Sequence, residues 1–580
     1  MSFVTRLQWF FKTRWLHYTL AITLMTAVSL LQTIPPKMIG NTIDDIQKGH
    51  LTASDLSRTV VFLIGLALLL YVLVYVWITT LYGNSVLLEK LLRGRFMAHL
   101  TRMTPSFFQR NSTGQLMALA TNDILNIGNT AGYGVMTLVN TLVGASVVIV
   151  TMISLIDYRL MLAALIPLPL LAVVISFLGR KVRARFMAAQ DAFGKMNDHA
   201  LESISGIRVL RSYVQENHDL AAFDDVTSVV MDRNREVSLL NALFQPLISL
   251  IVGVSYSIGI GYGSYLVFHG EISLGQLISF NIYLGMLIWP MISFGEFINV
   301  LQRGNASVDR VEQSFLQQPD LADQERPVQV DVPASIEMRG LSFTYPTAEQ
   351  PSLRNISFTL ERGGTLGIVG RTGSGKSTLL KQLLRQYPLA EEQLFIAGVP
   401  VEAIGLDRVK QWVSYVPQEH LLLSKSIRDN IALGKVDATD EEIAKAVEMA
   451  SFTSDIALMP EGMGTIVGEN GVMLSGGQKQ RLAIARALIL DAEILAMDDS
   501  LSAVDARTES RILQHIRKER AGKTTFITTH RLSAVSHADW ILVLDEGRIL
   551  EEGTHEELMH FGGWYRKQWE RQQMEAGLED

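Results

Sequence analysis

The pattern of apolar and polar positions divides the chain into two parts of different character. Long uncharged apolar runs fill the first half, whereas short apolar runs between polar and charged residues fill the second. A membrane-spanning helix needs about 20 predominantly apolar residues. Six runs meet this length, near Leu16–Pro36, Val60–Leu81, Val135–Ile156, Leu160–Leu178, Gln245–Phe268 and Leu274–Asn299. The pattern predicts a polytopic α-helical membrane domain with six transmembrane helices, followed by an α/β domain.

The charge of the segments between these runs alternates. Cations gather before the first run and in the two long links that follow the second and fourth runs: Arg6, Lys12, Arg14, Lys90, Arg93, Arg95, Arg102, Arg110, Arg180, Lys181, Arg183 and Arg185. The remaining connections carry few or no cations. Because basic segments stay on the cytoplasmic side, both termini and both long links are expected in the cytoplasm.

The two long links are expected to be cytoplasmic extensions of the membrane helices. Candidate turns at their tips are Asn111–Gln115 and Arg208–Gln215. Prolines among charged residues at Leu316–Pro333 indicate a linker. The expected domains are residues 1–315 for the membrane domain, 316–333 for the linker and 334–580 for the α/β domain.

The N-terminal segment places apolar residues on one helical face, namely Phe3, Leu7, Phe10 and Phe11. This face suits a helix at the inner membrane surface, although the segment can equally be the start of the first span. It is followed by no pattern of small residues typical of signal-peptide cleavage, so the first span is expected to stay in the membrane.

Glu296 is the one carboxylate inside a predicted span. An ionisable group there should face protein or water, where it can meet cationic substrates. The other interpretation is that the sixth span has already left the membrane at this point. Aromatic and Met side chains in the spans can line an adaptable cavity or simply pack: Tyr71, Tyr75, Trp77, Phe280, Tyr283, Met286 and Trp289.

Composition agrees with this division. Hydrophobic residues make up 48% of the 580 residues and charged residues only 19%. The net charge is -7 and no basic stripe appears, so nucleic acid is not expected as a partner. The chain has no cysteine, which excludes disulfides and thiol chemistry.

A phosphate-binding loop lies early in the second half. Thr365–Val369 predicts a strand and Thr378–Gln386 a helix, and between them stands the G-x-x-x-x-G-K-[ST] pattern. Its residues are Gly370, Arg371, Thr372, Gly373, Ser374, Gly375, Lys376 and Ser377, with Thr378 directly after. Backbone N–H groups of such a loop bind phosphate, the lysine neutralises its charge, and the Ser377 hydroxyl coordinates Mg²⁺.

A second stretch of nucleotide chemistry follows at Leu474–Asp505. It starts with Ser475, Gly476, Gly477 and Gln478 before a predicted helix, an arrangement suited to a phosphate at a helix N-terminus. The apolar run Ile494–Met497 then predicts a buried strand. The strand ends at Asp498, where a carboxylate suits Mg²⁺. Asp499 follows, and Asp505 closes the stretch.

These motifs, in this order and spacing, resemble the nucleotide-binding domain of an ATP-binding cassette (ABC) transporter. The resemblance covers essentially the whole chain in the domain order of exporters, and it implies ATP and Mg²⁺ as ligands. It further implies an adenine-stacking role for Tyr345, Mg²⁺ and water contacts for Gln418, a γ-phosphate contact for His530, and nucleotide contacts for Ser475–Gln478 and Asp505. It also implies that Gly468–Gly471 contacts the cytoplasmic loops, and that the two tips transmit motion.

One position departs from the family pattern. Active members have a glutamate after the strand-terminal aspartate, where this chain has Asp499. Aspartate is one methylene shorter, so its oxygens lie on the order of 1 Å farther back, and such a misplacement can cost about a hundredfold in rate. We therefore expect this site to hold MgATP and hydrolyse it slowly. The alternative is that the backbone adjusts and Asp499 serves as the base.

The number of motifs predicts a partner. The chain has one phosphate loop, one LSGGQ and six predicted spans, whereas the resembling family builds each ATP site from two such halves. We expect a half-transporter of the bacterial cytoplasmic membrane, in a heterodimer with a competent half, that exports amphipathic or hydrophobic drugs. The alternatives are a homodimeric lipid or peptide exporter and a nucleotide-sensing regulatory subunit that transports nothing.

Overall fold

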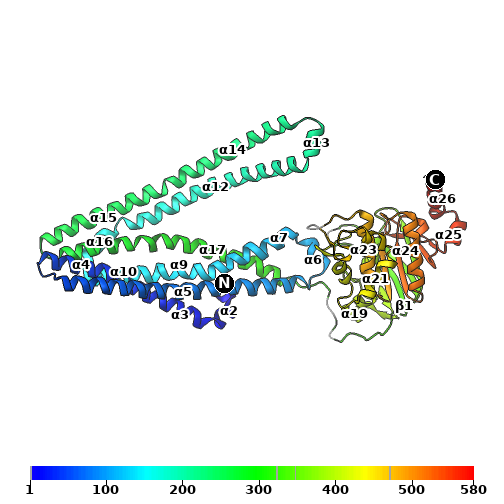
Figure 1. Ribbon diagram of the computed structural model, residues 1–580, viewed down its shortest axis with the longest axis horizontal. Coiled ribbons are helices and arrows are strands. Elements are labelled where there is room, and N and C mark those ends of the chain that lie inside the picture. The colour runs from blue at the N-terminus through cyan, green and yellow to red at the C-terminus, as the bar shows by residue number, and fades with distance from the viewer. Residues whose placement is uncertain (1–2, 322–323, 325, 347, 469–471, 580) are drawn as a thin grey trace. The chain divides into compact units, whose positions relative to one another are not determined.

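The computed structural model describes residues 3–321, 324, 326–346, 348–468 and 472–579. These residues form two compact units. The helical unit comprises Met1–Leu100 and Gly114–Gln317, and the α/β unit comprises Thr101–Thr113 and Gln318–Asp580. Figure 1 shows both units.

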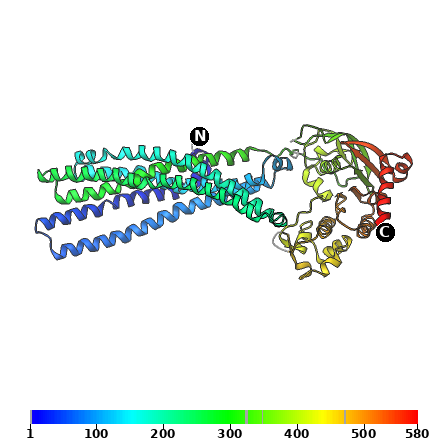
Figure 2. The ribbon, with the colours of Figure 1, turned by 90° about the horizontal axis from the view of Figure 1, so that it is seen from above.

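The helical unit consists of long helices joined by short connections. Its helices are α1 (Phe3–Arg6), α2 (Gln8–Thr13), α3 (Trp15–Leu31), α4 (Ile34–Gln47), α5 (Ala53–Leu100), α7 (Thr113–Ala118), α8 (Ile124–Asn129), α9 (Val135–Val139), α10 (Ala145–Leu155), α11 (Tyr158–Leu165), α12 (Leu168–Ser205), α13 (Ile207–Ser212), α14 (Glu216–Ala242), α15 (Phe244–Phe268), α16 (Leu274–Met286) and α17 (Ile288–Leu316). Three π-helical segments interrupt the helix between Thr113 and Leu155: η1 (Leu119–Asp123), η2 (Thr130–Gly134) and η3 (Asn140–Gly144). In Figure 2 most of these helices run along one common direction within the unit.

Five helical stretches of the described chain are long and apolar enough to cross a membrane: Trp15–Gln47, Ala53–Leu100, Thr113–Leu155, Glu216–Phe268 and Leu274–Leu316. The predicted fourth span, Leu160–Leu178, is not a continuous helix. It is divided between α11 and α12, because the helix breaks at Ile166–Pro167, and a proline removes a helical hydrogen bond. The fourth predicted span is therefore a helix in two pieces. This break does not reduce the number of predicted spans, because the stretch Trp15–Gln47 is likewise divided between α3 and α4.

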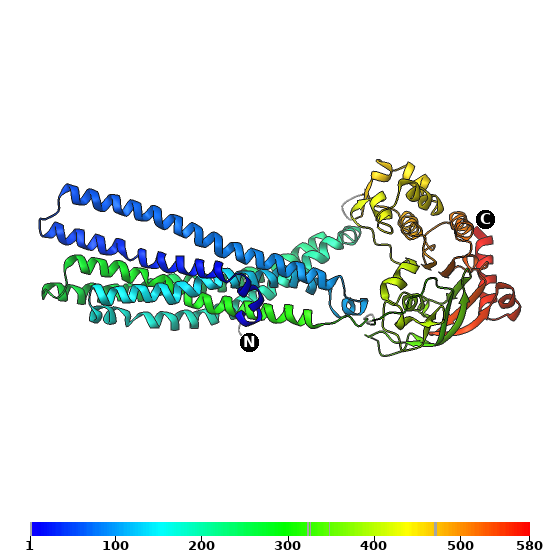
Figure 3. The same cartoon turned by 90° about the horizontal axis from the view of Figure 1, so that it is seen from below.

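The helices also extend beyond a bilayer, as predicted. The 48 residues of α5 span about 72 Å at 1.5 Å per residue, against a hydrocarbon core of about 30 Å. Figure 3 shows α5 alongside α3 and α4 in the helical unit. The second long link forms α12 and α14, which lie side by side and turn at α13, a helix that overlaps the predicted tip Arg208–Gln215 (Figure 1).

The first predicted tip overlaps the observed turn only at Asn111 and Ser112, which are not helical. The chain turns at α6 (Pro105–Arg110), before the predicted Asn111–Gln115. Thr104 is extended, with φ -84° and ψ 163°, because the residue before a proline avoids the helical region, and Pro105 then starts the new helix. By its contacts α6 belongs to the α/β unit, where the Gln109 amide donates a hydrogen bond to the Tyr387 hydroxyl over 2.8 Å.

The N-terminal helices pack against the rest of the helical unit. Phe3, Leu7 and Phe10 of the predicted apolar face are buried. Arg6 forms an ion pair with Asp309 of α17, outside the apolar face. Location at the membrane surface stays a prediction for this segment.

The crossing of α4 and α16 shows why small residues occur in this unit. A Cβ added to Gly275 would lie 1.9 Å from the backbone oxygen of Gly40, and one added to Gly40 would lie 2.4 Å from the oxygen of Gly275. Ser279 donates to the Pro36 carbonyl over 2.8 Å in the same crossing. Glycine therefore allows the two backbones to approach closely, as small residues do between membrane helices.

The α/β unit is built on a six-stranded sheet in the order β12–β11–β3–β10–β9–β6, beside a four-stranded sheet in the order β2–β1–β4–β5. Its strands are β1 (Ser335–Phe343), β2 (Leu353–Glu361), β3 (Thr365–Gly370), β4 (Leu394–Ile396), β5 (Val399–Pro400), β6 (Val413–Val416), β7 (Lys425–Ser426), β8 (Ile466–Val467), β9 (Ile494–Asp498), β10 (Thr524–Thr528), β11 (Trp540–Asp545) and β12 (Arg548–Gly553). Its helices are α6, α18 (Lys376–Leu383), α19 (Leu406–Trp412), α20 (Ile427–Ala432), α21 (Asp440–Met449), α22 (Thr453–Ala457), α23 (Gly476–Leu488), α24 (Ala506–Glu519), α25 (His555–Phe561) and α26 (Trp564–Glu579), with short 3-10 turns η4 (Val401–Ala403), η5 (Gly462–Gly464) and η6 (Leu532–Ala534).

The six-stranded sheet separates two apolar cores. Along β9, Leu495 and Met497 enter one core, and Ile494 and Ala496 enter the other. Strands β3, β6, β9, β10 and β11 are paired in parallel, so their carboxyl ends lie along one edge. Ligands of open parallel sheets bind at this edge, and the candidate site is built there.

We predict that Gly275→Leu destabilises the helical unit, because the new side chain has no space at the α4–α16 crossing. The matched control is Gly65→Leu on α5, where a Cβ meets nothing within 4 Å. The temperature at which the detergent-solubilised protein loses monodispersity measures the effect. We expect a clear decrease for Gly275→Leu only, and equal values for both variants would contradict the close crossing.

Candidate nucleotide-binding site

The phosphate loop connects β3 to α18, as the spacing predicted. Three of its glycines have positive φ, namely Gly370 (149°), Gly373 (81°) and Gly375 (104°), and the last is the residue that precedes α18. Such angles are rarely open to other residues, so the glycines allow the chain to reverse directly into the helix. The N–H groups of the first turn of α18 therefore point out of the helix next to the loop.

Lys376 is folded back over this loop. Its side chain is only 7% exposed, and its ammonium group donates to the carbonyls of Gly370 and Arg371, each over 2.9 Å. Burial lowers the pKa of Lys376, while the nearby Asp499 and Asp498 carboxylates oppose that shift. The ammonium group of Lys376 is held only by neutral carbonyl oxygens. It can leave these oxygens and bind a phosphate oxygen instead.

Asp498 is the point where three strands and the loop helix meet. The residue is 1% exposed at the end of β9. One carboxylate oxygen accepts hydrogen bonds from Ser377 and Thr528, each over 2.8 Å, and the other accepts from the Tyr415 hydroxyl over 3.1 Å. A paired carboxylate and serine hydroxyl with this arrangement supply the oxygen ligands that Mg²⁺ prefers.

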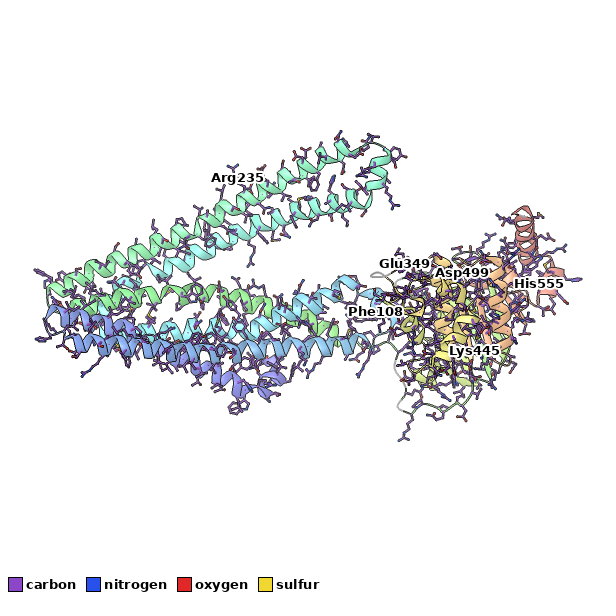
Figure 4. All side chains as sticks on the ribbon, in the orientation of Figure 1. Phe108, Arg235, Glu349, Lys445, Asp499 and His555 are labelled. Atoms are coloured by element: carbon purple, nitrogen blue, oxygen red, sulfur yellow. The ribbon has the colours of Figure 1, made fainter. Side chains whose placement is uncertain are left out.

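Asp499 has an unusual backbone conformation directly after this strand. Its φ is 44°, in the left-handed region, which aspartate tolerates better than most residues. Its N–H donates to both the carbonyl and the hydroxyl oxygen of Thr528, each over 3.0 Å. These bonds fix the main chain, so the reach of the carboxylate depends on the length of the side chain. Figure 4 shows Asp499 in the α/β unit.

Burial shifts the pKa values of Asp499 and His530 in opposite directions. Burial raises the pKa of the Asp499 carboxyl, against the lowering effects of His530 and Lys376. The carboxylate therefore needs a higher pH than an exposed aspartate before it can accept a proton. Burial, together with the positive charge of Lys376, lowers the pKa of His530, so the imidazole is neutral at neutral pH and can donate one N–H.

A cavity of about 550 Å³ joins these groups at the carboxyl edge of the sheet. Its lining contains the predicted site residues Thr372, Gly373, Ser374, Gly375, Lys376, Ser377, Thr378, Gln418, Asp498, Asp499 and His530. The hydroxyl of Ser374 is buried and has no hydrogen-bond partner in the described part of the chain. An open donor, a movable ammonium group and a carboxylate–serine pair fit a nucleotide phosphate with its Mg²⁺. Gly370 and Arg371 contribute through their carbonyls on Lys376.

Tyr345 does not line this cavity. Its hydroxyl lies 3.1 Å from the Thr378 hydroxyl, and its ring packs edge-on against Phe343 and Tyr387, with centroid distances of 5.0 and 5.2 Å. The residue therefore stands directly behind the loop helix. Its adenine-stacking role stays a prediction from the resemblance.

The residues of the LSGGQ stretch stand at the start of α23 and do not line the cavity either. Ser475 caps this helix, since Gln478 N–H donates to its hydroxyl over 3.3 Å and the Gln478 side chain accepts from Ser475 N–H over 2.9 Å. A Cβ on Gly477 would lie 2.9 Å from the Ala503 carbonyl, so glycine permits a close approach of this turn to the Ser502–Asp505 loop. A Cβ on Gly476 would lie 3.6 Å from the Ala503 side chain, which is an ordinary van der Waals contact.

Asp505 caps α24 by accepting from the N–H of Thr508 over 3.0 Å, and this bond lowers the pKa of Asp505. Its predicted nucleotide contact is thus not formed within this chain's own cavity. Residues 469–471 of the predicted loop-contacting segment Gly468–Gly471 lie outside the described residues.

Sequence reasoning missed several residues of the site. Thr528 and Tyr415 hold Asp498, and the cavity lining also includes Gln350, Pro351, Ser352, Arg354, Glu546 and Gly547. Glu546 and Gly547 form the turn between β11 and β12 and both have positive φ. Gly547 was the signal in the sequence, because glycine marks such turns.

Comparison with known proteins gives two matching family models. The model described as "ABC transporter transmembrane region" matches residues 16–291, and the model described as "ABC transporter" matches residues 353–502. A "Probable multidrug resistance ABC transporter ATP-binding/permease protein YheI" from Bacillus subtilis is 50% identical over 573 residues, which cover 99% of this chain and 98% of that protein. The "Multidrug resistance-like ATP-binding protein MdlA" of Escherichia coli is 38% identical over 580 residues, which cover 100% of this chain and 98% of that protein.

One further relative is named for a different activity, and one solved structure has a similar fold. An "ATP-dependent lipid A-core flippase" of Syntrophus aciditrophicus is 33% identical over 480 residues, covering 82% of this chain and 79% of that protein. A solved structure described as "Structure of a bacterial Atm1-family ABC exporter with ATP bound" has a TM-score of 0.78, covers 97% of this chain and 98% of that chain, and is 24% identical. At this identity the match shows the fold alone.

We predict that Lys376→Met abolishes nucleotide binding at this loop, because no other ammonium group reaches the loop carbonyls in the described chain. The matched control is Lys381→Met on the same helix, whose ammonium lies over the Tyr345 ring instead, 5.9 Å from its centroid. Equilibrium binding of a fluorescent ATP analogue to the full-length protein measures both. We expect at least about a tenfold loss, or ~1.4 kcal/mol, for Lys376→Met only. Equal affinities would contradict the assignment.

Proposed function

Because the chain belongs to the ABC transporter family, we propose that it is one half of an ATP-driven exporter in the bacterial cytoplasmic membrane. Its proposed substrates are amphipathic or hydrophobic drugs, by analogy with the relatives named for multidrug resistance. The observation that carries the proposal is the cavity with Lys376, Asp498 and His530 on the same chain as five helical stretches, among the described residues, that are long and apolar enough to cross a membrane.

Each group around this cavity has a distinct task in nucleotide binding. The loop N–H groups and Lys376 bind phosphate oxygens, and Ser377, Asp498 and Gln418 provide oxygen atoms for Mg²⁺. The neutral His530 donates a hydrogen bond towards the terminal phosphate. None of these tasks requires Asp499, so binding does not depend on the residue that departs from the family pattern.

Hydrolysis, in contrast, depends on the position of the Asp499 carboxylate. Its main chain is fixed by two hydrogen bonds to Thr528, which limits the adjustment that a shorter side chain needs. Burial also raises the pKa of the Asp499 carboxyl. At mildly acidic pH, a smaller fraction of the protein therefore has Asp499 ionised and able to accept a proton. The proposal is therefore a site that binds MgATP firmly and hydrolyses it slowly.

A second cassette completes the site in this proposal. Ser475–Gln478 and Asp505 do not line the cavity of their own chain. They are available to a second phosphate loop, and the corresponding residues of the partner would cover the loop of this chain. We favour a heterodimer, because a partner with a glutamate after its strand-terminal aspartate restores one fast site, whereas a homodimer has two slow ones.

Lipid export by a homodimer is the second candidate, favoured by the identity of 33% to a lipid A-core flippase. The two candidates differ in what the chain does alone. A homodimer hydrolyses ATP and responds to lipid without any partner, whereas the heterodimer requires the second half for fast turnover.

We predict that Asp499→Glu increases ATP hydrolysis by the purified chain in lipid nanodiscs by about a hundredfold, because the added methylene returns the carboxylate to the water-positioning distance. Asp407→Glu, at an exposed position on α19, makes the same chemical change away from the site and should leave the rate unchanged. Release of phosphate measures the rates. Fast hydrolysis by the unaltered chain would overturn the proposed slow site.

We also predict that ATP stabilises a two-chain complex. Co-expressed candidate partner halves should copurify with this chain, and the complex should persist longer with ATP than without nucleotide. Lys376→Met in this chain should reduce that difference. If ATP changes neither the lifetime of any such complex nor that of a homodimer, the shared site is wrong.

A further inference from the structure

The π-helical part of the helical unit lies against α17 along a continuous seam. Four hydrogen bonds define this seam: Thr141 to the Pro290 carbonyl over 3.5 Å, Tyr133 to the Glu296 carboxylate, Thr130 to the Val300 carbonyl over 3.1 Å, and Ser307 to Asp123 over 2.7 Å. As the residue number rises on one helix, it falls on the other, so the helices run antiparallel. π-helical segments are frequent at functional sites.

Two cavities lie along the seam, on either side of the Tyr133–Glu296 pair. The first, of about 380 Å³, is mostly apolar and is lined by Met25, Val28, Ser29, Gln32, Val74, Trp77, Asn140, Gly144, Val148, Met286, Trp289 and Pro290. The second, of about 250 Å³, is more polar and is lined by Tyr82, Asn126, Asn129, Thr130, Tyr133, Val300 and Arg303. All of these residues belong to the helical unit.

The first cavity contains three of the seven side chains that the sequence offered as cavity or packing residues. Trp77, Met286 and Trp289 line it, whereas Phe280 and Tyr283 are fully buried in the apolar core. Trp77 is 8% exposed, and its indole N–H has no hydrogen-bond partner in the described part of the chain. A buried indole that lacks a partner beside a cavity is suited to a ligand with a hydrogen-bond acceptor.

Glu296 differs from Glu89 and Asp123, the acidic residues of this unit whose side chains are buried. Glu89 pairs with Arg93 over 3.1 Å, and Asp123 pairs with Arg310. For Glu296 no cation lies within 4 Å among the described residues, and Tyr133 is its hydrogen-bond donor. In the interpretation that places Glu296 inside the sixth span, a carboxylate without a cationic partner is expensive unless it serves a ligand or a water-filled space.

The sequence spacing places this carboxylate between the two cavities. Trp289, Glu296 and Arg303 are separated by seven residues each, which is close to two helical turns and about 10 Å along one face of α17. Trp289 lines the apolar cavity and Arg303 lines the polar one. A ligand along this face therefore meets an aromatic surface, then a negative charge, then a positive charge.

We propose that the seam selects amphipathic organic cations, with the apolar body in the 380 Å³ cavity and the cationic group against Glu296. The positive charge of Arg303 disfavours the reverse orientation. This inference rests on the proposed export function and narrows its substrates from amphipathic compounds in general to those with a cation about 10 Å from an aromatic or aliphatic body.

The experiment compares two probes that differ only in charge. One is a naphthalene fluorophore that carries a trimethylammonium group, and the other carries a tert-butyl group of the same shape. Their binding to the full-length chain in nanodiscs is measured by fluorescence anisotropy. We expect Glu296→Gln to weaken binding of the cation by about tenfold, or ~1.4 kcal/mol, and to leave the neutral probe unchanged.

Two further variants control the interpretation. Glu296→Asp keeps the charge and should keep the preference for the cation. Glu271→Gln removes an acidic residue that pairs with Arg159 outside the seam, and should change neither probe. The temperature at which each detergent-solubilised variant loses monodispersity shows whether its helical unit is folded.

The outcomes separate this inference from the proposed function. An unchanged cation preference in Glu296→Gln, or an equal loss for both probes, overturns the selection of cations by Glu296. If both probes stimulate ATP hydrolysis of the paired transporter while the preference is unchanged, export stands and only the inference fails. If neither probe binds or stimulates the unaltered protein, the proposed drug export fails as well.

Discussion

The Asp498 carboxylate is the interaction on which the nucleotide site depends. It ties the end of β9 to the end of β10 through Thr528, to β6 through Tyr415 and to the phosphate loop through Ser377. Because the carboxylate is buried, loss of these bonds would leave an unpaired charge at the carboxyl edge of the sheet. The same contacts that position a metal ligand therefore also hold together the strands that form the site.

The next residue shows how this rigid frame limits the chemistry. Asp499 cannot shift freely, because its N–H is held by the two oxygens of Thr528 and its main chain is in the left-handed region. The frame is suited to nucleotide binding even where the side chain is too short for fast hydrolysis. This division between binding and hydrolysis is the physical reason for proposing a partner with a competent site.

Local patterns in the sequence were sufficient for most of the α/β unit. The strand–loop–helix setting of Lys376 and the end of the strand at Asp498 follow from short motifs, whose geometry is set by nearby glycines and apolar residues. Short motifs do not indicate which distant segments are in contact. For this reason Tyr415 and Thr528 were not recognised as partners of Asp498. In the helical unit, the turn before Pro105 was missed because polar composition outweighed the proline signal. The pairing of Tyr133 with Glu296 requires the fold.

The central claim, a slow ATP site completed by a second chain, can be tested by locating the terminal phosphate after turnover. The paired transporter is given photoreactive ATP labelled in the γ-phosphate, allowed to turn over, then cross-linked, and the label is measured on each chain. We predict that the label stays on this chain and is lost from the partner. Loss of the label from both chains at the same rate would contradict the account.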